Sequence, residues 1–221
     1  MQNIDDSWVQ DLWTWADKYN IPDLKWIEHD SYLEHGYFKG LPRDKDKLLQ
    51  LKELNFLGYQ LPYLPKEIGK LVNLTKLYLS GNKLTELPQE IEKLVNLEEI
   101  YVPGNHLNIF PAQTSKLNKL KILILQENQL TTIPKELGDF TNLEVLELGG
   151  NQLSSLPKEL GKLTKLTTLT IWKNRLTKLP KEMENLLNLT EFDCLYNKLE
   201  LTQEDAQWLE KLMIKECRVN I

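Results

Sequence analysis

The side chains that most often carry catalysis or bind metals are few in this chain. It has three histidines and two cysteines, and it lacks Cys-x-x-Cys, His-Glu-x-x-His, phosphate-loop and Gly-x-Ser-x-Gly segments. His29 and His35 lie near Asp30 and Glu34, a donor set that could hold one metal ion, but the spacing matches no ligand motif. We therefore predict that the protein is not an enzyme, and we expect neither a metal nor a cofactor.

Aromatic, aliphatic and acidic side chains recur at a regular interval in the sequence and offer a surface for contact with a partner. Tyr78 and Tyr101 occupy the same position in successive repeats of the sequence, and Trp172 lies two residues past the equivalent position further along. Tyr and Trp dominate interface energies, and an acidic rim favours a basic partner. The predicted partner-binding residues are Tyr78, Glu99, Tyr101, Ile122, Ile124, Val145, Glu147, Trp172 and Asp193.

A 23-residue repeat must position these side chains. Its segments follow Leu-x-x-Leu-x-Leu-x-x-Asn, and the asparagines are Asn82, Asn105, Asn128, Asn151, Asn174 and Asn197. Prolines keep the same interval at Pro65, Pro88, Pro111, Pro134, Pro157 and Pro180. A fixed period of this length predicts a solenoid whose units each contact only their neighbours.

The spacing within one unit indicates its structure. Leu-x-Leu alternates with a period of two, so both leucines point inward from a short strand, and equivalent strands form a parallel sheet. The Asn amide both donates and accepts, so it can satisfy turn groups in its own coil and the next. The Leu-Pro-x-x-Ile-x-x-Leu segment predicts a short helical or 3₁₀ turn on the opposite side.

The residues between the inward leucines are expected to face outward on the sheet. Strand propensity alone could explain Ile122, Ile124 and Val145, because β-branched residues favour strands in any context. It does not explain an outward Trp172, since an exposed apolar patch usually marks a contact surface. The sequence therefore predicts that the outward sheet face binds a protein.

The motif resembles the leucine-rich repeat family, and more narrowly its 23-residue subtype with Leu-Pro-x-x-Ile-x-x-Leu segments. That subtype occurs in bacterial proteins, including those of Leptospira, and in Ras-group intracellular proteins. The resemblance implies an α/β solenoid, a horseshoe with parallel strands on the concave face and helical or 3₁₀ turns on the convex face. It also implies a non-catalytic protein-binding module, with a bacterial secreted effector or surface-associated factor that binds a host molecule as the alternative.

Both ends are predicted to be caps over the open core. Residues 1–50 form a Trp-rich cap that contains a decayed repeat, residues 51–200 form seven repeats, and residues 201–221 form a helix and a last short strand. Ser7 is expected to cap the first helix and Thr202 the last one, over Gln203–Met213. The last strand is expected at Glu216–Val219, which would make Cys194 and Cys217 neighbours on adjacent strands.

Composition limits the partner and the location. The net charge of −5 and the absence of an isolated basic block argue against a nucleic-acid binder. The sequence shows neither a Sec-type signal peptide nor an apolar run long enough to insert in a membrane. Two cysteines make no disulfide framework. We expect a cytoplasmic monomer that binds a protein, while export by a non-Sec route stays open.

Overall fold

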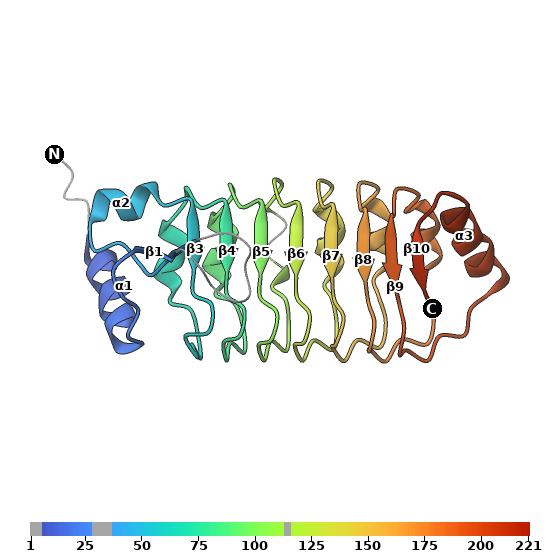
Figure 1. The fold of residues 1–221 in the computed structure, drawn as a ribbon, viewed down its shortest axis with the longest axis horizontal. Helices are drawn as coiled ribbons and strands as arrows, with labels where there is room; N and C mark the ends of the chain where they lie inside the picture. Colours follow the sequence, from blue (N-terminus) through green and yellow to red (C-terminus); the bar gives the residue numbers. More distant parts are fainter. Residues whose placement is uncertain (1–5, 28–36, 113–115) are drawn as a thin grey trace.

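The computed structural model describes residues 6–27, 37–112 and 116–221. Figure 1 shows an elongated stack of coils with short strands along one face and short helical turns along the other. Helices α1 (Ser7–Lys18) and α2 (Lys45–Gln50) lie at the amino-terminal end, and α3 (Gln203–Ile214) lies at the carboxyl-terminal end. The predicted solenoid with a parallel sheet is confirmed.

Eight strands form one parallel sheet within the described residues. They are β3 (Glu53–Asn55), β4 (Lys76–Tyr78), β5 (Glu99–Tyr101), β6 (Ile122–Ile124), β7 (Val145–Glu147), β8 (Thr168–Thr170), β9 (Glu191–Asp193) and β10 (Arg218–Asn220). From β3 to β9 every strand pairs with the next in the register of the repeat, so that Leu54 lies beside Leu77 and Leu77 beside Ile100. The sheet order follows the sequence because each coil stacks directly on the one before it.

The inward leucines and the 3₁₀ helices enclose one continuous apolar core. Leu77, Leu123 and Leu146 are fully buried in it. Within the described residues, the 3₁₀ helices are η1 (Lys66–Lys70), η2 (Gln89–Lys93), η4 (Lys135–Asp139), η5 (Lys158–Lys162) and η6 (Lys181–Asn185). Each follows an extended proline, which has no N–H to leave unsatisfied at a helix start. The predicted helical turn is confirmed as a 3₁₀ helix.

The recurring asparagines form a ladder between the coils. Asn128 donates its amide to the carbonyls of Val102 and Leu125, at 2.9 and 3.1 Å, and its Oδ1 accepts the N–H of Leu107 at 3.0 Å. The same contacts recur from Asn82 to Asn197. Each side chain therefore satisfies backbone groups of two successive coils at the turn that follows the strand.

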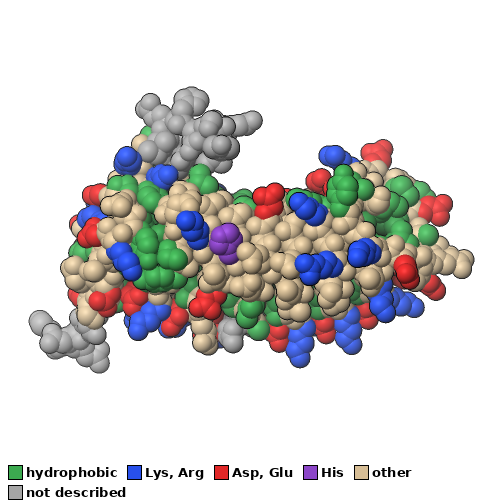
Figure 2. All heavy atoms as spheres, turned by 90° about the horizontal axis from the view of Figure 1, so that it is seen from below, with side chains coloured by type: hydrophobic (Ala, Val, Ile, Leu, Met, Phe, Trp, Pro, Cys, Tyr) green, Lys and Arg blue, Asp and Glu red, His purple; other side chains and the backbone are tan. Residues whose placement is uncertain are grey.

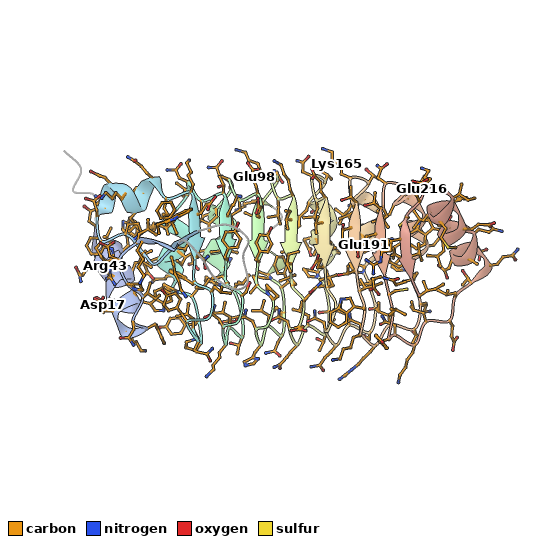
Figure 3. All side chains as sticks on the ribbon, viewed as in Figure 1. Asp17, Arg43, Glu98, Lys165, Glu191 and Glu216 are labelled. Carbon is orange, nitrogen blue, oxygen red and sulfur yellow. The ribbon has the colours of Figure 1, made fainter. Side chains whose placement is uncertain are left out.

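A second ladder runs along the opposite edge of the sheet, before the strands begin. Asn73 donates to the carbonyl of Leu49 at 2.8 Å, and Asn188 donates to that of Thr164 at 2.8 Å. Lys165, which lies at this edge in Figure 3, donates to Asn142 Oδ1 at 2.6 Å. The side chains of Asn73 and Asn188 thus take part in coil stacking.

Glycines bring successive 3₁₀ helices into close contact. A Cβ on Gly161 would lie 2.6 Å from Glu182 Cβ, and one on Gly138 would lie 2.6 Å from Glu159 Cβ, with the carbonyl oxygens of both glutamates closer still. These distances are shorter than any van der Waals contact, so the next coil occupies the space of a side chain. Glu184 takes the equivalent position in η6, and among the described elements no further 3₁₀ helix follows it.

The amino-terminal elements cover one end of the core. Val9, Leu12 and Trp15 of α1 are buried, and Trp15 contacts Phe56 of the first repeat. The expectation that Ser7 caps this helix was wrong, because Asp6 is the N-cap and Ser7 is already helical. The Asp6 carboxylate is instead paired with the Lys45 ammonium at 2.6 Å, which ties α1 to α2.

The strands β1 (Lys25–Ile27) and β2 (Tyr37–Lys39) form a separate antiparallel pair near this end. Phe38 of β2 is half exposed, whereas Leu41, after the strand, is buried. The division of the chain into two caps and seven repeats remains a prediction.

The carboxyl-terminal end is covered by α3. Thr202 caps it as predicted: Thr202 Oγ1 accepts the Asp205 N–H at 3.1 Å, and Asp205 accepts the Thr202 N–H at 2.8 Å. Trp208 is buried against Phe192, with ring centroids 5.2 Å apart. Among the described helices, none is long and apolar enough to span a membrane.

The last strand departs from the register of the repeat. It covers Arg218–Asn220 instead of Glu216–Val219, and its Arg218 pairs with Glu191, whereas the repeat interval would have placed Ile214 there. The twelve-residue α-helix takes more chain than a five-residue 3₁₀ helix, and this displaces the strand along the sequence. The expectation that Cys194 and Cys217 are neighbours on adjacent strands was therefore wrong, because Cys194 follows β9 and Cys217 precedes β10. Both are buried free thiols.

Replacing Asn128 by Ala should lower the free energy of unfolding by about 3 kcal/mol. The change leaves the Leu107 N–H and several carbonyls without partners in the interior, at about 1–3 kcal/mol for each group. Chemical denaturation measures the effect. Asn142→Ala is the control, because it removes hydrogen bonds only at the exposed edge and should have an effect of about 1 kcal/mol. Equal effects of the two changes would contradict the ladder.

Gly161→Ala should destabilise the protein by about 1–3 kcal/mol, because its methyl group would overlap the backbone of η6. Glu184→Ala, at the equivalent position one coil later, should change the free energy of unfolding by less than about 0.5 kcal/mol. Thermal and urea unfolding of the two variants compare them directly. A Gly161→Ala protein as stable as the wild type would show that the coils are further apart than described.

Candidate protein interface

The nine predicted contact residues lie on the outward face of the sheet, on the six consecutive strands β4 to β9 or directly after them. Tyr78, Tyr101, Ile124, Glu147, Thr170 and Asp193 form one row across this face by strand pairing. A second row consists of Lys76, Glu99, Ile122, Val145, Thr168 and Glu191. The constant register therefore brings residues that are far apart in sequence onto one surface, and Figure 3 shows Glu191 among its side chains.

Two stacked tyrosines form the amino-terminal half of the face. The rings of Tyr78 and Tyr101 are 4.9 Å apart and nearly parallel, with 20° between their planes. Both hydroxyls donate to Glu99 Oε2, at 3.5 and 3.2 Å. Burial and the negative charge of Glu99 raise the pKa of both phenols, so they remain protonated donors at neutral pH.

A neighbouring ammonium group compensates the negative charge of Glu99. The Lys76 ammonium lies 3.2 Å from Glu99 Oε1 and 3.8 Å from Glu53 Oε1. The hydrogen bond with Glu99 raises the pKa of Lys76, which keeps it charged. Glu99 is thus held by Lys76 and both tyrosines, and this fixes the two aromatic rings before any partner arrives.

The aliphatic centre is less accessible than the sequence suggested. Ile124 is only 8% exposed, although it is not part of the inner core, so neighbouring side chains on the face cover it. Ile122 and Val145, one row away, are partly exposed. These two residues, rather than Ile124, offer the aliphatic surface between the tyrosines and the acidic half.

The carboxyl-terminal half carries carboxylates with little compensation. Glu147 is half-buried and accepts a hydrogen bond from Gln126, yet desolvation, with a smaller contribution from the charge of Glu191, raises its pKa. Within the described part of the chain, the cation closest to these carboxylates is Arg218, 4.0 Å from Glu191. This half of the face therefore keeps a negative potential.

Trp172 lies over Gly149 of the neighbouring coil. A Cβ on Gly149 would fall 2.6 Å from the indole Cδ1 and closer still to Nε1, so only glycine leaves room for the ring. Trp172 is partly exposed, as predicted, and is not part of the inner core. The sequence reasoning did not assign a role to Gly149, although a glycine one repeat interval before a tryptophan was the available signal.

The space-filling view shows the shape of this surface. In Figure 2 the sheet face forms the upper margin, which is hollowed over the middle strands and rises toward the carboxyl-terminal end. Lys, Asp and Glu side chains mark the opposite, lower margin. The outward sheet face is thus a shallow concave surface, here called the concave face, with an aromatic half and an acidic half.

Metal binding finds no support in the part of the chain that the structure describes. There, no group of three or more His, Cys, Asp or Glu side chains could hold a metal ion. The candidate residues His29 and His35, with Asp30 and Glu34, lie outside the described residues.

Comparisons with known proteins agree with the fold. A family model described as a leucine-rich repeat region matches residues 108–215, and one described as two copies of the leucine-rich repeat matches residues 72–119. A search of curated proteins finds no match.

Solved structures of leucine-rich repeat proteins are similar to the chain. A leucine-rich repeat protein of Leptospira interrogans is 32% identical with a TM-score of 0.61, over 77% of this chain and 50% of that one. The ectodomain of the Arabidopsis thaliana receptor kinase GASSHO1/SCHENGEN3, in complex with CASPARIAN STRIP INTEGRITY FACTOR 2, is 33% identical with a TM-score of 0.66. That match covers 71% of this chain and 20% of the ectodomain.

An internalin from Listeria monocytogenes shares the fold at 21% identity, with a TM-score of 0.67 over 81% of this chain and 51% of the internalin. The chain thus spans half the length of the Leptospira protein and less of the plant ectodomain. The repeated Leu and Asn positions, the parallel sheet with its 3₁₀ helices and the two family models agree: the chain belongs to the leucine-rich repeat family.

Proposed function

We propose that the protein is a non-catalytic interaction module whose concave face binds a protein partner. The observation that carries this proposal is the fixed pair Tyr78 and Tyr101, held by Glu99 on an open surface. Aromatic side chains that are ordered before binding contribute contact area with little loss of conformational entropy. Trp172 on Gly149 offers a second such group.

The charge of the face favours a partner with a basic segment. Glu147, Glu191 and Asp193 lie on strands β7 and β9, and Arg218 alone among the described cations comes within 4.0 Å of them. A basic segment would relieve their mutual repulsion and would be steered toward the face at low salt. The partner would place apolar side chains against the tyrosines and cations against this acidic half.

The comparisons support a binding function. The plant ectodomain, at 33% identity, is a complex with CASPARIAN STRIP INTEGRITY FACTOR 2. The Leptospira protein, at 32% identity, favours a bacterial origin. A monomer acting in the cytoplasm remains part of this proposal, and fractionation of the producing cells, with sedimentation of the purified protein, tests both points.

Trp172→Ala and Tyr101→Glu should each abolish capture of a partner, because they remove the fixed aromatic groups or place a charge among them. Affinity capture from a lysate of the producing cell, followed by titration of the captured protein, measures the loss. Val95→Glu is the matched control, since Val95 is exposed away from the sheet face. Binding that survives both concave changes would show that the partner site lies elsewhere, provided that both variants unfold like the wild type.

Glu147→Gln should raise the melting temperature at pH 7 and leave it unchanged near pH 4. The raised pKa means that the folded state binds a proton more tightly than the unfolded state, so the wild type loses stability as pH rises above the ordinary value of 4.5. The amide has no charge to desolvate, and the difference therefore appears only where Glu147 is ionised. Glu144→Gln serves as the exposed control. A stabilisation that is equal at both pH values would contradict the account of this carboxylate.

A further inference from the structure

The turns that follow the strands form one edge of the solenoid, here called the turn edge. In the last coils this edge carries cations that are not part of the concave face. Lys173, Arg175, Lys178 and Lys198 are exposed, and within the described residues none of them forms an ion pair. Figure 2, which looks onto this edge, shows Lys and Arg side chains over its carboxyl-terminal half. A protein with a net charge of −5 thus concentrates free positive charge at one place.

Coil stacking brings these cations together. The Lys173 N–H donates to the carbonyl of Leu195 at 2.7 Å, which places Lys173 beside Tyr196. The Lys198 N–H donates to the carbonyl of Leu176 at 2.9 Å, which places Lys198 beside Arg175. Glu200, the described carboxylate on this turn, donates its N–H to Thr177, which precedes Lys178. The four cations therefore flank two adjacent turns.

An apolar hollow opens at the same place. It has a volume of about 280 Å³ and is lined by Cys194, Tyr196, Asn197, Leu199, Leu201 and Ile221. Tyr196, one of these lining residues, is 78% exposed, more than any other large hydrophobic residue described. A hollow of this size accepts one or two apolar side chains and has an aromatic ring to cover them.

A backbone donor of a residue that lines the hollow lacks the partner that its equivalents have in the inner coils. In the inner coils the N–H of the residue two positions after the Asn donates to the Asn Oδ1 of the next coil, as Leu153 does to Asn174 and Leu176 does to Asn197. Leu199 is the equivalent residue in the last coil, and its N–H has no partner among the described residues. Asn220 instead donates to Asp193 because of the shifted register.

Two of the side chains on this edge are kept at a conformational disadvantage. The residue before the Asn has a positive φ in every coil, and Gly81, Gly104 and Gly150 occupy the position without strain. Lys173 and Tyr196 adopt φ values of 49° and 59° at the same position, as Glu127 does at 52°. Glycine would relieve the backbone strain at both positions, so the turns themselves do not require a lysine and a tyrosine.

We propose that this turn edge is a second docking surface, for an acidic peptide segment with a hydrophobic anchor. The anchor fills the hollow under Tyr196, a backbone or carboxylate oxygen accepts the Leu199 N–H, and flanking Asp or Glu side chains pair with Lys173, Arg175 and Lys198. A polyanion without apolar groups would leave the hollow empty, so the combination favours a peptide. The surface is separate from the concave face and opposite to it in charge.

A fluorescein-labelled peptide, EDELFDED, provides the probe, and fluorescence anisotropy measures its binding to the full chain. Lys173→Gly and Tyr196→Gly should each weaken binding at least tenfold while leaving the melting temperature equal to or above that of the wild type, because glycine suits the backbone there. The double variant Lys173→Glu/Arg175→Glu should abolish binding. Its control, Lys70→Glu/Lys93→Glu, makes the same charge change on exposed lysines of the 3₁₀ helices η1 and η2 and should bind like the wild type.

Two further probes test other occupants of this surface: the peptide EDESSDED, which lacks the apolar residues, and a heparin oligosaccharide, which is a polyanion without a peptide. Both should bind at least tenfold more weakly than EDELFDED. Equal binding of either probe would overturn the proposal, and so would binding that both glycine variants retain. Self-association of the chain through the hollow, detected by sedimentation, would also overturn it. Tyr101→Ala, on the concave face, should bind the peptide normally, so this test can fail or succeed independently of the concave-face proposal.

Discussion

The buried asparagine ladder is the constraint on which the rest of the structure depends. A turn carries more backbone donors and acceptors than its own short segment can satisfy, and burying them unpaired would be destabilising. Each Asn side chain satisfies groups of two coils at once, as Asn128 does with Leu107 and Leu125. The ladder works only if every coil is stacked in the same register, and that register in turn lines up the outward side chains of the sheet.

The same constraint explains which parts of the structure could be predicted from sequence. A constant period sufficed to place Tyr78 beside Tyr101 and to predict the strands and 3₁₀ turns, because identical spacing repeats identical geometry. It failed where the return segment changed. The helix α3 shifts the last strand out of the common interval, and the relation expected between Cys194 and Cys217 was lost with it. Helix length is set by how α3 packs on the last coil, which no periodicity encodes.

The sequence period could not predict the details of the candidate site, for a related reason. Which residues face outward follows from alternation, but how far each is exposed depends on the size of its neighbours. Ile124 is covered by the side chains around it, and Trp172 can lie over the next coil because Gly149 is small. The network of Lys76, Glu99 and the two tyrosines likewise requires side-chain directions that spacing does not give. Side-chain packing across strands, rather than the fold, decides the chemistry of the face.

Amide hydrogen exchange at single-residue resolution tests the ladder most directly. The N–H groups of Leu84, Leu107, Leu130 and Leu153, which donate to asparagine side chains of the following coil, should exchange only through opening of the stacked array. The N–H of Leu199, at the equivalent position without a following ladder residue, should exchange fastest of this set. Fast exchange at the inner leucines, or equal protection at Leu199, would contradict the account.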